Sequence, residues 1–268
     1  MPESVSAVQL KTFMEQVPIT QKTIIIIPLY GYFKDTPTEQ LNYETLVKFM
    51  EGFRFKDRYV QYVFIGESSR LTEDVLNAVV VKFANGATKF LDMPPFSVYA
   101  DYLQHGLEYS LEDTSNEFIV FANPWVALGW STLDDLVARL NATDYAMICG
   151  WDKKEDNMKP EDFLTGNITS PVERVGISRD LFGINRTIGG MISFDDGYKT
   201  PYFVVADLWG QIHSMGQESL RSGMLPYYSF DVDWSLIEPE DNFNEDLKYF
   251  EAKWKFIPGG IFYKSDKS

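Results

Sequence analysis

Two short, almost entirely apolar runs lie near the start of the chain. Residues 23–30 have the sequence TIIIIPLY, and residues 59–65 have the sequence YVQYVFI. Runs rich in β-branched and aromatic residues are typical of strands that are buried on both faces of a parallel sheet. Between them, residues 43–53 carry apolar side chains at helical spacing. The pattern therefore predicts a strand, a helix and a second parallel strand.

The same alternation continues for about ninety residues. Further helices are predicted at 72–83, 98–111 and 132–140, and further strands at 89–93, 117–122 and 144–150. Strands separated by helices indicate an α/β fold with a mostly parallel central sheet and right-handed crossovers.

The periodicity lapses between residues 152 and 188, where charged residues, Gly, Pro and Asn predominate. We expect a long connection there and no second core. Regular patterns then return, and they predict strands at 190–194, 202–206 and 225–230 and helices at 208–222 and 242–256.

Composition supports one folded domain over residues 1–268, because 45% of the 268 residues are hydrophobic. The formal net charge of −15 would repel a polyphosphate backbone. No cluster of Lys and Arg compensates for it, so neither nucleic acid nor an anionic membrane surface is an expected partner.

The chain has one cysteine, Cys149, in an apolar run, and we interpret it as a core residue. Residues 1–21 lack a basic region followed by an apolar stretch, and no run approaches the ~18 apolar residues that a membrane span needs. By default, a cytoplasmic location is expected, and oligomeric state is left open.

Several catalytic motifs are absent from the sequence. There is no Walker loop, no GxGxxG and no zinc-ligand spacing, and the two histidines, His105 and His213, lie outside any nucleophile motif. Asp231 and Asp233 could bind a metal from one face of a strand, although a solvated strand face is the more ordinary interpretation.

Open parallel sheets bind ligands beyond the carboxyl ends of their strands, where loops converge. The first predicted strand ends near Pro28 and Tyr30, the second is followed by Glu67 and Ser68, and the strand at 117–122 is followed by Asn123. These five residues are the candidate ligand-binding residues at that edge.

The segments around these positions resemble a known family in order and spacing. They are IIIIPLYG, FIGESSRLTEDVL, YADYLQHGLEYSLEDTSNEFIVFANPWVAL, and TPYFVVADLW followed by RSGM. Over about residues 23–230 they resemble glycosyltransferase family 2 of the GT-A nucleotide-diphospho-sugar transferases, particularly its rhamnosyltransferase-like members. The resemblance implies an inverting hexosyltransferase with a nucleoside-diphosphate-sugar donor and an unidentified glycan or other hydroxyl-bearing acceptor.

The resemblance also divides the chain into parts. Residues 23–150 would form a Rossmann-like nucleotide-binding half, residues 151–240 an acceptor-side half, and residues 241–268 a C-terminal packing helix and tail. The nucleotide would lie over the five edge residues, with Tyr30 stacked on the base. Gln104 stands at the amide position of the family's Asn-x-Gly motif.

Two positions depart from the family pattern. Gly66 stands where the family has an acidic residue that contacts the base, and Trp125 stands where a carboxylate anchors Mn²⁺ or Mg²⁺. An indole cannot ligate a hard cation, so no metal ligand is assigned. Transfer without a metal, a metal held elsewhere, a fold without catalysis and a purely structural Trp125 all remain open. Without a metal, the diphosphate charge would need donors such as Arg174, Arg179, Arg186, Lys153 or His213.

On the acceptor side, the resemblance makes Asp207 the candidate general base. Trp209 could form an aromatic floor for a sugar ring, and His213 could meet phosphate. The structural alternative is that Asp207 caps a helix beginning at residue 208. A non-catalytic binding or assembly module with the same fold is the alternative function. A nucleotidyltransferase is a weaker one, because the loop at 29–36 carries only Lys34 as a cation.

Overall fold

The computed structural model describes residues 22–34, 41–52, 59–82, 88–129, 131–165, 169–170, 172–232, 237 and 240–255. Its first four strands are parallel neighbours in the order β3-β2-β1-β4. They are β1 (Thr23–Pro28), β2 (Val60–Gly66), β3 (Thr88–Asp92) and β4 (Phe118–Ala122). In this arrangement Ile25 lies opposite Tyr62 on one side and Val120 on the other.

Beyond β4 the sheet continues through an antiparallel strand. β8 (Leu181–Asn185) lies between β4 and β6 (Met147–Asp152) and is antiparallel to both. β9 (Ser219–Ser229) then pairs in parallel with β6, while β5 (Val126–Leu128) and β7 (Glu173–Val175) pair antiparallel with β9. β1, β2, β3, β4, β6 and β9 thus share one direction, which confirms the predicted α/β class with a mostly parallel sheet.

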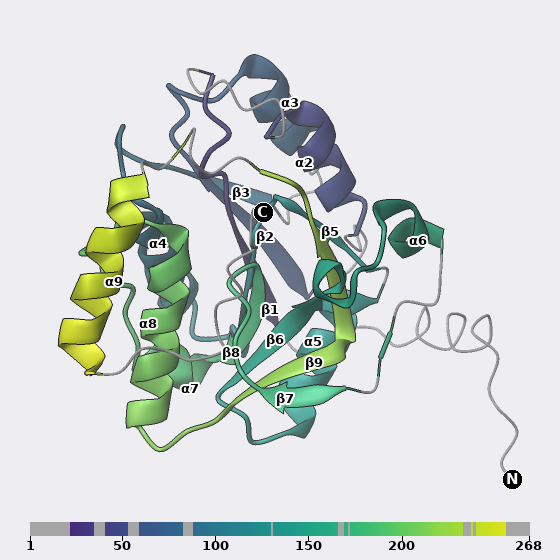
Figure 1. Ribbon diagram of the computed structural model, residues 1–268. Helices are drawn as coiled ribbons and strands as arrows, with labels where there is room; N and C mark the ends of the chain where they lie inside the picture. The colour runs from purple at the N-terminus through teal and green to yellow at the C-terminus, as the bar shows by residue number, and fades with distance from the viewer. Residues whose placement is uncertain are drawn as a thin grey trace, which may run out of the picture.

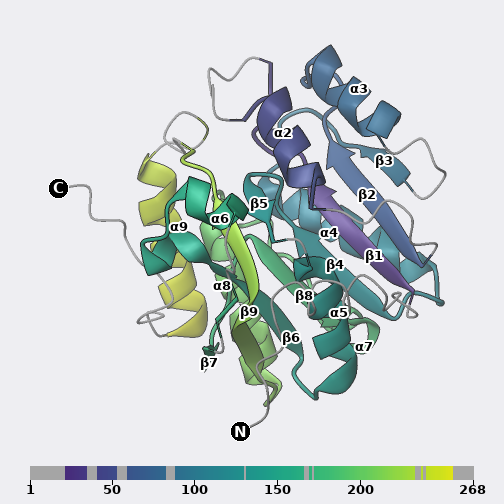
Figure 2. The ribbon, with the colours of Figure 1, turned by 90° about the vertical axis from the view of Figure 1, so that its right-hand side faces the viewer.

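Helices cover both faces of the sheet (Figures 1 and 2). On one face lie α2 (Tyr43–Met50), α3 (Glu73–Lys82) and α5 (Thr132–Ala142). On the other lie α4 (Tyr99–Glu112), α7 (Arg186–Gly189) and α8 (Pro201–Ser214), and α9 (Glu240–Trp254) packs on the outside of α8.

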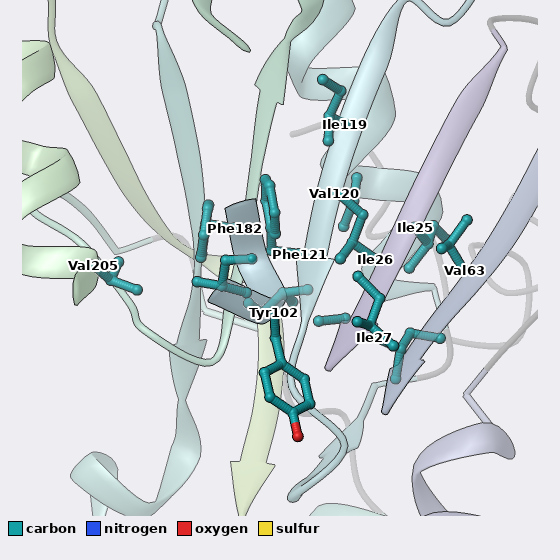
Figure 3. Close-up of a cluster of buried hydrophobic side chains, with 14 of the residues drawn as sticks. Ile25, Ile26, Ile27, Val63, Tyr102, Ile119, Val120, Phe121, Phe182 and Val205 are labelled. Atoms are coloured by element: carbon teal, nitrogen blue, oxygen red, sulfur yellow. The ribbon is translucent and has the colours of Figure 1, made fainter. Parts of the chain in front are cut away.

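The core lies where β1 and β4 meet these helices. The four isoleucines of β1 are buried, as are their partners on β4 and, apart from Gln61, on β2 (Figure 3). α4 approaches β1 and β2 closely at Gly106, where a Cβ atom would lie 2.5 Å from Ile26 Cγ2. Gly106 stands at the glycine of the resembled family's Asn-x-Gly motif, and the packing of α4 on β1 requires a glycine there.

The predicted alternation of the first half is confirmed within two or three residues, and so are α5, β6, the end of β9 and α9. The strand predicted at 202–206 is wrong, because α8 is one helix over Pro201–Ser214. The helix predicted at 208–222 is confirmed as far as residue 214 and is wrong beyond it, where β9 begins at Ser219. The side chains of α8 are buried between α4 and α9, so they are apolar on nearly every side. A short apolar run of this kind is equally compatible with a strand.

The long connection predicted between 152 and 188 is also wrong. The segment contains a short 3₁₀ helix (Lys153–Asp156), α6 (Pro160–Thr165), β7, β8 and α7. The LFGIN sequence of β8 is short and interrupted by Gly183, and its stability comes from its two neighbouring strands, which local sequence does not reveal. Residues 190–194, predicted as a strand, form a turn and irregular backbone.

The interpretation of Cys149 as a core residue is confirmed. Cys149 is fully buried on β6, as predicted, and burial raises the pKa of its thiol to about 12. Within the described residues, every helix is too short or too polar to span a bilayer.

Candidate functional site

Glu67, the first residue after β2, is fully buried at the carboxyl end of the sheet. The Tyr102 hydroxyl donates to Glu67 Oε1 at 2.8 Å, the Phe96 amide donates to Oε2 at 2.9 Å, and Arg70 lies 3.2 Å from the same oxygen. Figure 3 shows the Tyr102 ring extending toward the end at which the β1 and β2 arrows terminate. Burial and the bond to Glu67 raise the pKa of Tyr102. The carboxylate is thus engaged by protein donors.

Asn123, the first residue after β4, is bonded in the same way. The Tyr99 hydroxyl donates to Asn123 Oδ1 at 2.7 Å, and Asn123 Nδ2 donates to the carbonyl of Arg179 at 3.0 Å. Tyr30 packs edge-on against both Tyr99 and Tyr102, with ring centroids 5.6 Å apart in each pair. Two tyrosines from the first turn of α4 therefore connect the ends of β1, β2 and β4.

Trp125 is part of this packed end of the sheet. Its side chain is 1% exposed, its indole Nε1 donates to Asp180 Oδ1 at 2.6 Å, and its ring centroid lies 5.9 Å from that of Tyr99. Arg179 Nε donates to the same Asp180 oxygen at 3.1 Å. The residue that stands at the resembled family's metal-anchoring position is thus a buried indole bonded to Asp180.

Gly66, at the other departure from the family pattern, ends β2 in a closely packed position. A Cβ atom there would lie 2.9 Å from Leu71 Cδ1. Even the first carbon of an acidic side chain would require Leu71 to move. The packing around Gly66 therefore disfavours a carboxylate side chain at this position.

The residues at this edge do not fit a hard cation. No group of three or more His, Cys, Asp or Glu side chains that could hold a metal ion occurs in the part of the chain that the structure describes. Asp180 is the carboxylate beside Asn123 and Trp125, and its Oδ1 already accepts from an indole and a guanidinium. Hard cations need several oxygen ligands, so no step is assigned to a metal here.

The other predicted edge residues are placed as follows. Pro28 is the buried last residue of β1, and the Ser68 amide and hydroxyl both donate to Asp92. Gln104 lies farther along α4, where its Oε1 accepts from the Phe194 amide and its Nε2 donates to Glu108. The structure thus brings Ser68 to the edge and directs Gln104 toward the segment before α8.

Asp207 lies in the interior of α8 and is fully buried. Its carboxylate accepts from Tyr198 Oη at 3.0 Å, Gln211 Nε2 at 2.9 Å and Trp254 Nε1 at 2.8 Å, and Lys253 Nζ is 2.8 Å away. Because α8 begins at Pro201, the alternative in which Asp207 caps a helix start is wrong. Asp207 instead ties α8 to α9.

Trp209 and His213 stack on each other one turn apart on α8, with ring centroids 5.5 Å apart and an interplanar angle of 10°. The end of α8 leads into the start of β9 at the amino end of the sheet. These two rings therefore lie toward the edge opposite Asn123.

Of the Asp231 and Asp233 pair, Asp231 accepts from Lys154, and Asp233 lies outside the described residues.

The proposed cationic partners for phosphate are widely separated. Arg186 donates to carbonyl groups at the end of α4, Lys153 pairs with Asp156, and Arg174 lies over the Trp151 ring. Arg179 is the member of this set beside Asn123, and its side chain is partly exposed.

Sequence reasoning missed Tyr99, Tyr102 and Asp180. The two tyrosines are three residues apart at the start of a predicted helix, so their shared face was a signal that could have been used. Asp180 precedes a strand that the sequence did not predict, and no local signal marks it.

Comparison with known proteins identifies similarity in structure alone. No protein-family model and no curated protein sequence matches the chain. TarS residues 1–349 from S. aureus is similar over 87% of this chain and 65% of its own, with a TM-score of 0.55 and 12% identity. The mannosyltransferase PcManGT from Pyrobaculum calidifontis, determined with GDP-Man and Mn²⁺, is similar over 81% of this chain and 61% of its own, with a TM-score of 0.51 and 13% identity. GalNAc-T7, determined with UDP, GalNAc and Mn²⁺, is similar over 78% of this chain and 44% of its own, with a TM-score of 0.52 and 11% identity.

The chain has a GT-A-type glycosyltransferase fold. At these identities the similarity establishes fold, and chemistry has to be argued from the residues of the site. The chain spans less than two thirds of the length of each of the three structures. In the GT-A-type fold of this chain, the carboxyl ends of β1, β2 and β4 are joined by Tyr30, Tyr99 and Tyr102.

Proposed function

We propose that this protein transfers a sugar from a nucleoside-diphosphate donor to a hydroxyl-bearing acceptor. The supporting observation is that Tyr30, Glu67 and Asn123 meet at the carboxyl end of a GT-A-type sheet, connected through Tyr99 and Tyr102. Ligands of open parallel sheets bind at this end. Two proteins of similar fold were determined with GDP-Man or UDP. Assignment to family 2 and an inverting outcome rest on the sequence segments quoted above.

Arg179 is the proposed charge partner of the donor diphosphate. Its backbone carbonyl accepts from Asn123 at the end of β4, its guanidinium pairs with Asp180 at 3.1 Å, and its side chain is 30% exposed. A planar guanidinium can donate two parallel hydrogen bonds to phosphate oxygens. Leaving-group charge would then be stabilised without a metal at Trp125. Ser68 and Pro28 keep their proposed places along the donor, whereas Gln104 would have to exchange its bonds to Phe194 and Glu108 to contact it.

Asp207 remains the proposed general base, and its surroundings set a condition on that role. Its carboxylate is engaged by Tyr198, Gln211, Lys253 and Trp254 and has no exposed surface. An acceptor hydroxyl would reach it only after Lys253 and Trp254 at the end of α9 had moved. Trp209 and His213 lie farther along the same helix, toward the edge opposite Asn123, so only an acceptor that extends along α8 would contact them.

The burial of Trp125 and Asp207 favours one second candidate, a non-catalytic module that binds a sugar nucleotide. In such a module the fold is retained, and both side chains serve packing. Fold alone does not separate the two functions.

Calorimetric titration first tests the nucleotide binding that both candidates require. Uridine, guanosine, thymidine and cytidine diphosphates are titrated into the full chain with and without Mn²⁺, and at least one is expected to bind in the absence of metal. If none binds under either condition, both candidate functions fail.

Donor hydrolysis then tests catalysis. The nucleoside-diphosphate sugar of the base that binds is incubated with the wild type and with Asp207→Asn, below the unfolding temperature of both proteins. Catalysis predicts hydrolysis above background by the wild type and loss in the variant. Equal background rates would support the binding module and remove Asp207 from any catalytic role.

A further inference from the structure

Phe96 is a large aromatic side chain with 80% of its surface exposed. It lies in the turn that follows β3, at the same carboxyl end of the sheet as Glu67 and Ser68. Single exposed hydrophobic side chains are common on protein surfaces, so exposure by itself assigns no role. Phe96 differs from such residues in its left-handed backbone conformation and in its contact with Arg70.

The Phe96 backbone has a φ angle of +67°, in the left-handed region. A residue with a side chain is disfavoured there, and the second central position of a turn with positive φ usually holds Gly or Asn. The turn is fixed by the bond from the Phe96 amide to the buried Glu67 carboxylate and by the bond from Ser97 Oγ to the Pro94 carbonyl. Pro94 and Pro95 further limit its backbone freedom. The ring is thus held in solvent on a rigid turn.

Arg70 lies between Phe96 and a second aromatic ring. Its guanidinium carbon is 3.8 Å from the centroid of the Phe33 ring and 5.0 Å from that of Phe96. Phe33 in turn packs edge-on against Tyr30 at 5.8 Å. A chain of ring and cation contacts therefore runs from Tyr30 at the end of β1 through Phe33 and Arg70 to Phe96. Most of the Phe96 side chain is open to solvent.

We infer that the Phe96 ring is the stacking surface for the nucleobase of the bound nucleoside diphosphate. This inference rests on the proposed function and deepens it. Tyr30, the residue expected to stack on the base, is only 8% exposed, whereas Phe96 lies at the same edge and is exposed. Every nucleobase has a flat π face, and stacking on a side-chain ring requires no particular hydrogen-bonding pattern. The Phe96 turn is already fixed, so little conformational entropy is lost when a base binds to it.

The test is equilibrium binding to Phe96→Gly and Phe96→Leu in the full chain. The four nucleoside diphosphates, the corresponding nucleosides and inorganic pyrophosphate are titrated, and thermal unfolding is measured in parallel. Phe96→Gly removes the ring and relieves the left-handed strain, so its unfolding temperature should equal or exceed that of the wild type. Phe96→Leu keeps apolar bulk without a π face and serves as a second variant. Met191→Gly, at an exposed apolar residue after α7, is the control.

Stacking predicts that both Phe96 variants bind each nucleoside diphosphate for which the wild type has measurable affinity about 5- to 100-fold more weakly. Affinity for pyrophosphate should be unchanged, and Met191→Gly should bind like the wild type. Wild-type affinity in both Phe96 variants would overturn the inference while leaving the proposed function intact. Weakening confined to one of several bases that the wild type binds, or extended equally to pyrophosphate, would also overturn it. Absence of nucleotide binding by the wild type would instead mark failure of the proposed function.

Discussion

Trp125 donates its indole N–H to Asp180 Oδ1 at 2.6 Å, joining the residue before β5 to the residue before β8. Both side chains are buried, and Asp180 also accepts from Arg179. The bond spans the junction between the parallel strands and the antiparallel strand of the sheet. A carboxylate and an indole therefore stabilise the end of the sheet at which ligands of this fold class bind.

Trp125→Phe is expected to lower the free energy of unfolding by about 2–3 kcal/mol. The change removes a hydrogen bond to a buried carboxylate and leaves a gap against Tyr99. Chemical denaturation measures the effect. Trp209→Phe, at a partly exposed tryptophan that stacks on His213, is the matched control and should cost about 1 kcal/mol or less. Equal losses in the two variants would argue against a special role for the Asp180 bond.

Asp207→Asn is expected to lower the free energy of unfolding by about 2–4 kcal/mol, because a buried carboxylate with four donors loses its charge. Asp195→Asn is the control, since Asp195 contacts the same Lys253 from a more exposed position. It should destabilise the protein less. The prediction is contradicted if thermal and chemical unfolding rank the two variants in the opposite order.

Asp246 on α9 caps the start of α8. Its carboxylate accepts from the Lys199 amide, the Thr200 amide and the Thr200 hydroxyl, and the side chain is 1% exposed. Asp246→Ala should therefore cost about 2 kcal/mol or more of stability. The adjacent Glu245 pairs with Lys199 at the surface and is 57% exposed, so Glu245→Ala should change stability by about 0.5 kcal/mol or less. Comparable effects at the two neighbouring positions would count against the cap.

The stability of the protein should depend on pH through Asp152. Burial at the end of β6 raises the pKa of this carboxyl group above its ordinary value of 3.8. The folded state then binds the proton more tightly than the unfolded state does. The corresponding stability is fully present below 3.8 and is lost as pH rises through the higher folded pKa.

Asp152→Asn removes this titration and can still accept hydrogen bonds from Ser229 and Lys154. Relative to the wild type, the variant should therefore be more stable at about pH 7 than at about pH 3.5. Denaturation curves at the two pH values give the comparison. A difference between the two proteins that stays constant across this range would rule out the proposed linkage.

The first half of the fold was predictable because its strands and helices carry their own patterns. β1 and β2 are almost wholly apolar, and the helices between them have regular apolar spacing. β8 was not predictable because the strand is only five residues long and is interrupted by Gly183. Pairing with β4 and β6 stabilises it as a strand. α8 was misassigned because burial by α4 and α9 removes the polar face that identifies a helix.

The candidate site was predictable to a similar degree. Tyr30, Glu67 and Asn123 follow strands that the sequence predicts, so their convergence at one edge follows from topology. Their hydrogen bonds could not be predicted, because the donors come from α4 and from the turn after β3, and an acceptor comes from the segment before β8. The exposed ring of Phe96 was likewise hidden, since its exposure depends on a positive φ angle that Gly or Asn would normally signal.

The insertion of β8 has a consequence for how the chain acquires its structure during synthesis. β4 gains its outer partner only when residues 181–185 are available, and β6 gains its partners from β8 and β9. A nascent chain that has emerged only as far as β6 therefore exposes the unpaired edge of β4, which is a site for association with other chains. The later third of the polypeptide is therefore needed before the edge of β4 is protected.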